Sequence, residues 1–171
     1  MRKIVLLTIL GLICANLSAQ TNNFFVEDGK IYWQKIYELD ADIESLLTNS
    51  GKFENIKFAD NTFSATIKSA RVDPNGRGAM NIPIYIRDNN MVGFVRIQQK
   101  ESRYRVTVEQ IKFIAVADGP FDKQGEETTL EFYALKKNGS LGSYFIKTAS
   151  LILDEYLTSI FLPVKELGDN W

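Results

Sequence analysis

Apolar and polar residues alternate along residues 53–117, and this alternation constrains the fold more than any other feature of the sequence. A period of two is typical of strands that bury one face, and short polar turns divide the segment into hairpins. Two expected turns, Asn89-Asn90 and Lys100-Glu101, independently place Val95 and Ile97 on the same apolar face. We therefore expect an antiparallel meander with one buried face.

Each expected turn also predicts which residues lie opposite one another, because register in a hairpin follows from the position of its turn. A further turn is expected at Asp60-Asn61. The expected pairs are Phe58–Phe63, Lys57–Ser64, Ile56–Ala65, Asn55–Thr66 and Glu54–Ile67 around Asp60-Asn61, then Ile86–Gly93, Ile84–Val95 and Ile82–Ile97 around Asn89-Asn90, and Ile97–Tyr104, Val95–Val106 and Gly93–Val108 around Lys100-Glu101.

Elements on both sides of the meander complete the expected fold. Lys30–Leu39 is predicted to be a strand, and Ala41–Asn49 a short helix capped by Asp40. Ser143–Leu162 is predicted to be a long helix that ends before Pro163. Its expected core stripe consists of Phe145, Ala149, Ile152, Tyr156 and Ile160. The predicted fold is α+β, a curved antiparallel sheet of about five to seven strands packed on the C-terminal helix.

The N-terminus is typical of a secretory signal peptide. Basic residues at positions 2 and 3 precede the apolar run Ile4–Ile13, and small and polar residues follow. Cleavage is expected after Ala19, which makes residues 1–19 the signal peptide and 20–171 a single domain with its core in 25–162 and a tail at 163–171. Cys14 is not expected to carry lipid, because lipidation requires a small residue where Ile13 stands. The protein is therefore expected in the periplasm or outside the cell.

Composition excludes several classes of function. The chain has no histidine, and its single cysteine is removed with the expected signal peptide, so a His-based triad, a thiol nucleophile and most zinc sites are excluded. The formal net charge of -1 gives no electrostatic basis for binding nucleic acid. No transmembrane segment, catalytic residue, metal site or cofactor is predicted.

Two segments and the aromatic C-terminal helix resemble a known family. The segments are DGKIYWQKIY, residues 28–37, and SRYRVTV, residues 102–108. They resemble the bacterial exported domain family of unknown function that has a TATA-binding-protein-like fold, over nearly all of the chain after residue 19. The resemblance implies a curved antiparallel sheet that grips a long C-terminal helix, and it implies no catalytic residues. The first helix is shorter here than in that family.

The expected pairing collects aromatic and basic residues on the outward face of the meander. These residues are Tyr85, Phe94, Arg96, Arg103 and Arg105. Such a patch could stack on sugar rings or hold an anionic group, since arginine makes bidentate contacts with anions. The other interpretation is a solvated sheet face, because exposed aromatic residues on strands are common.

Two loops were considered as further sites, and the sequence favours an ordinary loop for both. Gly76-Arg77-Gly78 could present backbone amides to an anion, but no helix follows it. Asp118, Asp122, Glu126 and Glu127 could bind calcium, but they lack the spacing of a calcium loop.

These observations favour an exported, non-catalytic binding or interaction domain. It would use the outward sheet face or the groove between sheet and helix, with an unidentified protein, glycan or lipid as partner. One alternative is a carrier that holds an apolar ligand between the sheet and the Ser143–Leu162 helix. Another is a hydrolase that depends on two carboxylates within about 5–9.5 Å of each other.

Overall fold

The computed structural model describes residues 23–38, 40–72, 81–118 and 123–163. The expected signal peptide and its cleavage site, Cys14, the Gly76-Arg77-Gly78 loop and most of the C-terminal tail lie outside the described residues. No helix in the described ranges combines the length and the apolar character needed to cross a membrane.

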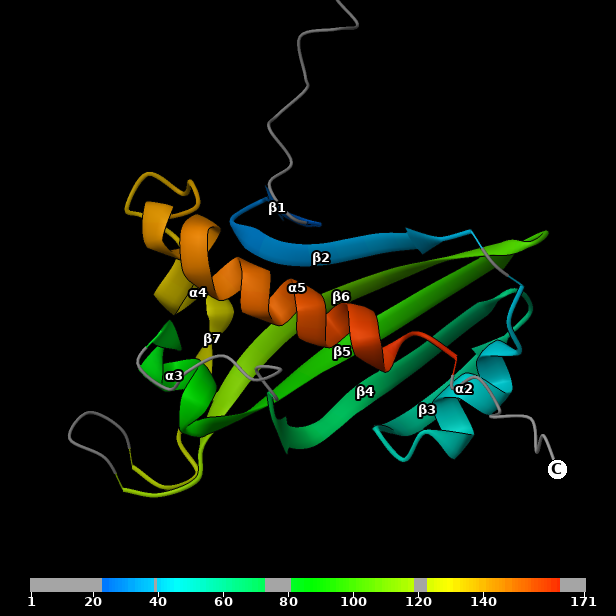
Figure 1. The fold of residues 1–171 in the computed structure, drawn as a ribbon, viewed down its shortest axis with the longest axis horizontal. Helices are drawn as coiled ribbons and strands as arrows, with labels where there is room; N and C mark the ends of the chain where they lie inside the picture. The colour runs from blue at the N-terminus through cyan, green and yellow to red at the C-terminus, as the bar shows by residue number, and fades with distance from the viewer. Residues whose placement is uncertain (1–22, 39, 73–80, 119–122, 164–171) are drawn as a thin grey trace, which may run out of the picture.

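One antiparallel sheet forms the body of the molecule (Figure 1). Its strands run in the order β1-β2-β6-β5-β4-β3, and a short strand, β7, pairs with β6 away from this path. The strands are β1 (Phe24–Glu27), β2 (Lys30–Tyr37), β3 (Phe53–Ala59), β4 (Thr62–Arg71), β5 (Asn89–Lys100), β6 (Arg103–Ala115) and β7 (Glu127–Thr129). The predicted antiparallel meander is therefore confirmed. The hairpin partner β1 was not predicted, although Asp28-Gly29, both with positive φ, form a tight turn before β2.

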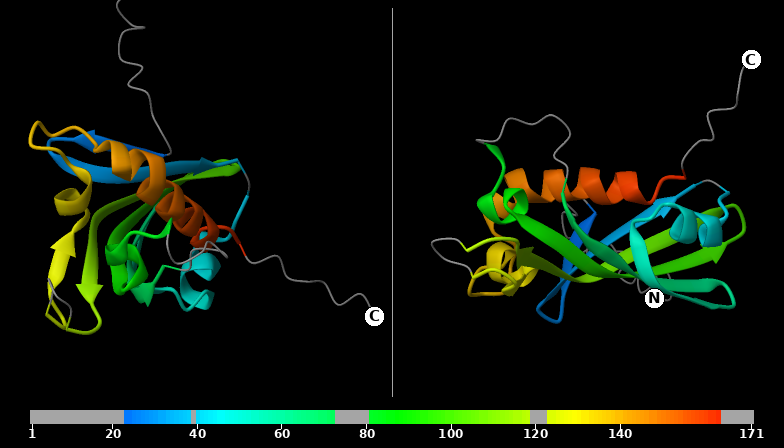
Figure 2. Two further views of the ribbon diagram at one scale, coloured as in Figure 1. Left: turned by 60° about the vertical axis from the view of Figure 1, so that its left-hand side comes forward. Right: turned by 90° about the horizontal axis from the view of Figure 1, so that it is seen from below.

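A single long helical segment lies on one face of the sheet, and the strands curve around it (Figure 2). It begins with a π-helical turn, η3 (Phe145–Ala149), and continues as α5 (Ser150–Ile160), so it is shorter than the expected Ser143–Leu162. Its buried stripe consists of Phe145, Ala149, Ile152, Leu153, Leu157, Ile160 and Phe161. The predicted α+β class, an antiparallel sheet packed on a C-terminal helix, is confirmed.

The core lies between this helix and what we call the inner face of the sheet. Val95 and Ile97 are fully buried there, as predicted. The ring of Phe161 stacks on Trp33 and Phe53, with centroids 5.9 and 5.3 Å away. Trp33 is thus a core residue, and its indole N–H donates to Asp154 on α5 over 2.7 Å. Hydrogen bonds to the helix therefore accompany apolar packing on this face.

The register between β5 and β6 differs by two residues from the prediction. The turn is formed by Glu101-Ser102, with Glu101 in the left-handed region at φ 55°, and Lys100 lies opposite Arg103. Val95 therefore faces Val108, and Ile97 faces Val106. A shift of two residues keeps every side chain on its predicted face, because the side-chain period of a strand is two. The predicted residue pairs between β5 and β6 were therefore wrong, but the face of the sheet predicted for each side chain was right.

The predicted strand Ile82–Arg87 and its turn at Asn89-Asn90 are wrong. Ile84–Arg87 forms a one-turn helix, α3, after Pro83, and Asn89 begins strand β5 opposite Ala115. Helical spacing explains the outcome: Ile82 and Ile86, four residues apart, are both buried, whereas Ile84 points to solvent with 66% of its surface exposed. The strand that pairs with this side of β5 is β4 instead.

Two smaller corrections concern the first hairpin and the first helix. Phe58–Phe63 and Lys57–Ser64 pair as predicted, but a bulge at Asn55, where φ is 54°, makes Phe53 rather than Glu54 the partner of Ile67. The bulge turns the apolar residue inward. The first helix, α2 (Ile43–Asn49), is capped by Asp42, not by Asp40, since the Asp42 carboxylate accepts the Ser45 N–H over 3.0 Å.

Candidate binding surfaces

The structure divides the predicted aromatic and basic patch between two places. Phe94, Arg96, Arg103 and Arg105 lie on the outer face of the sheet, opposite to α5, because they alternate with buried residues along β5 and β6. Tyr85 does not join them. It belongs to α3, at the far end of the sheet from the β5–β6 turn (Figure 1).

Arg96 sits in the middle of the outer face and is neutralised there. It lies between Ser64 on β4 and Thr107 on β6, not opposite Arg105 as predicted. Its guanidinium forms an ion pair with Glu109 over 2.9 Å, and the Glu109 side chain is mostly buried. The charge of Arg96 is thus already matched within the protein.

A basic hollow of about 380 Å³ lies at the β5–β6 hairpin end of the outer face. The pairing of the strands brings its residues together. Arg105 on β6 lies opposite Ile36 on β2 and opposite Gln98 on β5. Lys100 and Arg103 form the next pair on this face toward the turn. We use the name basic hollow for these five residues. Tyr104, whose side chain is buried on the inner face, also borders the hollow.

The cations of the basic hollow are weakly matched by negative charge. Arg105 donates through Nε to the neutral Gln98 side chain over 3.2 Å. Arg103 is 3.9 Å from the exposed Glu38 carboxylate. No carboxylate in the described part of the chain forms an ion pair with Lys100 or Arg105. Ile36, half exposed, adds an apolar surface beside these cations. The hollow is therefore suited to an anionic group attached to an apolar or sugar-like body.

Tyr85 instead belongs to a cluster that we call the aromatic tip, formed by Ile84, Tyr85, Phe132, Tyr133 and Tyr144. The rings of Tyr85 and Tyr133 stack with centroids 4.0 Å apart and planes 3° from parallel. Tyr133 and Phe132 come from a short helix, α4 (Leu130–Ala134). This short helix brings the two rings next to α3.

The interface between the sheet and α5 is filled by side chains. The helix residues that face the sheet and the inner-face residues beneath them are almost completely buried. The carrier hypothesis requires an enclosed cavity at this place, and the packing contradicts that requirement.

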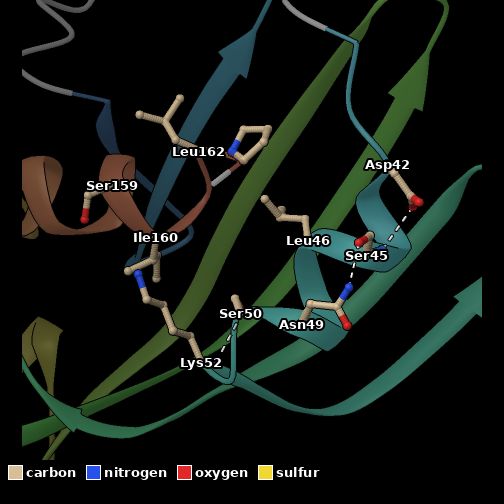
Figure 3. Close-up of a pocket in the computed structure, with 10 residues that line it drawn as sticks. Asp42, Ser45, Leu46, Asn49, Ser50, Lys52, Ser159, Ile160 and Leu162 are labelled. Carbon is tan, nitrogen blue, oxygen red and sulfur yellow. Dashed lines mark hydrogen bonds between the residues drawn. The ribbon is translucent and has the colours of Figure 1, made fainter. Parts of the chain in front are cut away.

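A groove of about 450 Å³ lies instead between α2 and the C-terminal end of α5 (Figure 3). Most of its lining is polar, and several of these polar groups bond to one another: Asn49 donates to Ser45 over 2.8 Å, and Ser45 N–H donates to Asp42. The groove is open to solvent rather than enclosed. It therefore lacks the enclosure expected of a carrier.

The carboxylates that share a pocket have structural partners. Glu109 and Glu131 both line a pocket of about 220 Å³. Glu109 is paired with Arg96, and Glu131 accepts the backbone N–H of Ile31 over 2.9 Å. A hydrolase would need one of the two as a proton donor to substrate, and neither is placed to serve without losing its partner.

The acidic loop considered for calcium is likewise occupied by local bonds. Asp118 accepts the Gln124 N–H over 2.9 Å, Glu126 accepts the Lys123 N–H, and Glu127 pairs with Lys112 over 2.8 Å. Asp122 lies outside the described residues. Across the described ranges, no group of three or more acidic, histidine or cysteine side chains is arranged to hold a metal ion.

Comparison with known proteins gives two similar solved structures. One is a TBP-like protein from Parabacteroides distasonis, 14% identical, with a TM-score of 0.47 over 80% of this chain and 94% of that one. The other is a DUF4468 family protein from Bacteroides ovatus, also 14% identical, with a TM-score of 0.48 over 86% of this chain and 96% of that one. No known sequence family and no curated protein matches.

The two descriptions agree with the resemblance stated from the sequence, an uncharacterised bacterial domain with a TBP-like fold. They name no ligand, partner or reaction. What this chain binds has to be argued from its own surface.

Proposed function

We propose that this chain is an exported, non-catalytic binding domain that holds an anionic group in the basic hollow. One observation carries the proposal: Lys100, Arg103 and Arg105 converge on a hollow of about 380 Å³ in which Lys100 and Arg105 have no ion-pair partner among the described residues. A cluster of cations with unused hydrogen-bond donors costs repulsion unless an anion binds there. Export is supported by the sequence of residues 1–19.

The ligand chemistry follows from the lining. Arginine offers planar, bidentate donors to carboxylate, phosphate or sulfate, and lysine adds a point charge. Ile36 supplies an apolar contact next to the charges, and Gln98 supplies an amide that hydrogen-bonds to Arg105. The expected partner is a glycan, lipid or protein that presents such an anion on its surface.

Titration calorimetry with two probes, inorganic pyrophosphate and trigalacturonate, tests the proposal. The variant Arg103→Ala/Arg105→Ala removes two of the three cations and is expected to weaken binding at least tenfold, a change of about 1.4 kcal/mol. Arg96→Ala is the matched control, because it also removes an outer-face arginine but one already paired with Glu109. Equal loss in both variants, or no binding of either probe by the parent protein, would remove the basic hollow from consideration.

A further inference from the structure

The aromatic tip exposes large apolar side chains at the end of the molecule opposite to the basic hollow. Ile84, Phe132 and Tyr144 have 66%, 76% and 61% of their surfaces exposed. They come from three separate elements, α3, α4 and the residue that precedes η3, which lie together at one end of the sheet (Figure 1). Exposed apolar residues scattered singly are normal, but a contiguous group indicates a binding surface.

A rigid base supports these side chains. The Tyr85 ring is stacked on Tyr133 and meets the buried Phe113 edge-on, with centroids 4.9 Å apart. Phe132 in turn packs edge-on against Tyr133 at 5.2 Å. Burial raises the pKa of Tyr85, and the neighbouring hydroxyls of Tyr144 and Tyr133 raise it further. These ring contacts hold Tyr85, Tyr133 and Phe132 in place beneath the exposed groups of the tip.

Three exposed lysines lie close in sequence to the residues of the tip. Lys136 and Lys137 occupy the exposed turn that follows α4, and Lys147 lies one helical turn after Tyr144. No ion pair joins any of the three to a carboxylate in the described part of the chain.

Two carboxylates belong to the same short helices. Asp88, at the end of α3, is paired with Arg87 over 2.7 Å, whereas Glu131 on α4 accepts the neutral Ile31 N–H and keeps its charge. The three lysines therefore outnumber the one of these two carboxylates that forms no ion pair in the described part of the chain.

The shape distinguishes between possible occupants. Ile84, Phe132 and Tyr144 are each more than half exposed, so their side chains project into solvent. Projecting aromatic and aliphatic groups with exposed lysines close by in the sequence fit the interface of a lipid bilayer, where aromatic rings are favoured at headgroup depth and lysines attract anionic lipids. We propose that the aromatic tip docks the protein on the surface of an anionic lipid membrane.

Flotation with lipid vesicles tests this proposal, using the exported protein purified from a Gram-negative host. The vesicles contain phosphatidylethanolamine with phosphatidylglycerol, or phosphatidylcholine alone. Binding is expected to the anionic vesicles, to weaken as salt is added, and to be much weaker on phosphatidylcholine. Intact-mass analysis must show the same N-terminus in every variant, so that the apolar run Ile4–Ile13 affects none of the comparisons.

Three variants identify the surface responsible. Ile84→Ser/Phe132→Ser/Tyr144→Ser is expected to reduce vesicle affinity at least tenfold, and Lys136→Ser/Lys137→Ser/Lys147→Ser to reduce it about fivefold per lysine and to remove the salt dependence. Phe58→Ser/Leu162→Ser, which also removes exposed apolar groups but from β3 and from the C-terminal end of α5, should bind as the parent does. Circular dichroism and urea unfolding verify that each variant folds.

Three results would overturn the proposal. These are no binding to either vesicle, unchanged binding by the tip variant, and a concentration-dependent dimer that the tip variant abolishes, which would make a second copy of the chain the occupant. The Arg103→Ala/Arg105→Ala variant should still bind vesicles, so failure of the basic hollow and failure of the tip are separable.

Discussion

The two faces of the sheet are built from the same strands and have opposite properties. Along β5, Val95 and Ile97 are completely buried against the helix side, whereas Arg96 and Gln98, which alternate with them, are exposed. The inner face is covered by α5, and its side chains are almost completely buried. The outer face keeps charges and a hollow open to solvent. The same strands therefore contribute the packed core on one side and the proposed binding surface on the other.

The largest expected effect comes from emptying the inner face. Leu157 on α5 is fully buried, so Leu157→Ala is expected to lower the free energy of unfolding by about 2–5 kcal/mol, from lost burial and the cavity left behind. Urea unfolding measures it. Ile36→Ala on the outer face is the matched control and should cost about 1 kcal/mol or less, since Ile36 is half exposed. Equal costs at the two positions would contradict the division between the faces.

A smaller effect is expected from the hydrogen bonds that tie α5 to the sheet. The Asp154 Oδ1 atom accepts from the indole N–H of Trp33 and from the amide of Asn23, each over 2.7 Å. Asp154→Ala leaves the buried indole N–H without an acceptor and should cost about 1–3 kcal/mol. Asp154→Asn retains an acceptor and should cost less. If both variants unfold at the same urea concentration, these hydrogen bonds do not hold the helix in place.

The stability that the inner face contributes is also expected to depend on pH. Burial of Tyr104 on the inner face raises its pKa to about 12, and its hydroxyl donates to the Phe161 carbonyl over 2.7 Å. The folded state therefore holds this proton more tightly than the unfolded state does. Stability should be fully present below pH 10 and fall between pH 10 and 12, by up to about 1.4 kcal/mol per pH unit for one tyrosine.

Urea unfolding at several pH values measures this decline. Tyr104→Phe should cost about 1 kcal/mol at pH 7, from the lost hydrogen bond, and should make the alkaline decline shallower. If Tyr104→Phe does not change the loss of stability at alkaline pH, Tyr104 is not the residue that causes this loss.

The smallest effect on stability is expected on the outer face. Arg96→Ala removes an ion pair in which the Arg96 side chain is about half exposed, and it should change the free energy of unfolding by about 1 kcal/mol. Added salt should shrink the difference further. A cost comparable to that of Leu157→Ala would mean that the outer face also holds the fold together.

The sequence predicted the faces of the sheet better than its pairs. Alternation assigns Val95 and Ile97 to the core whichever turn closes the hairpin, so a turn misplaced by one position, and the two-residue slip in register that results, leaves the core unchanged. The turn itself depends on which residue adopts the left-handed conformation, here Glu101, and several polar residues could have done so. The prediction of a strand at Ile82–Arg87 was wrong because three isoleucines at a spacing of two give the pattern of a strand. Pro83 and the residues that follow it form a helical turn instead.

Some residues of the candidate sites were predicted from the sequence, but the sites themselves were not. Arg103 and Arg105 were assigned to the outer face by alternation alone, and both line the basic hollow. Lys100 was assigned to a turn, and Ile36 lay in a strand whose neighbour was unknown, so the hollow could not be assembled from sequence. The aromatic tip was missed because Tyr85, Phe132 and Tyr144 approach only through two short helices and the start of a third.

One measurement tests the central claim, that the outer face binds and the inner face does not. It is a titration of the isotope-labelled protein with inorganic pyrophosphate, and then with trigalacturonate, followed by backbone amide shifts. The account predicts saturable shifts at Ile36 and within Gln98–Arg105, with the amides of Ser150–Ile160 unchanged. Saturable shifts along α5 with none in the hairpin would contradict it.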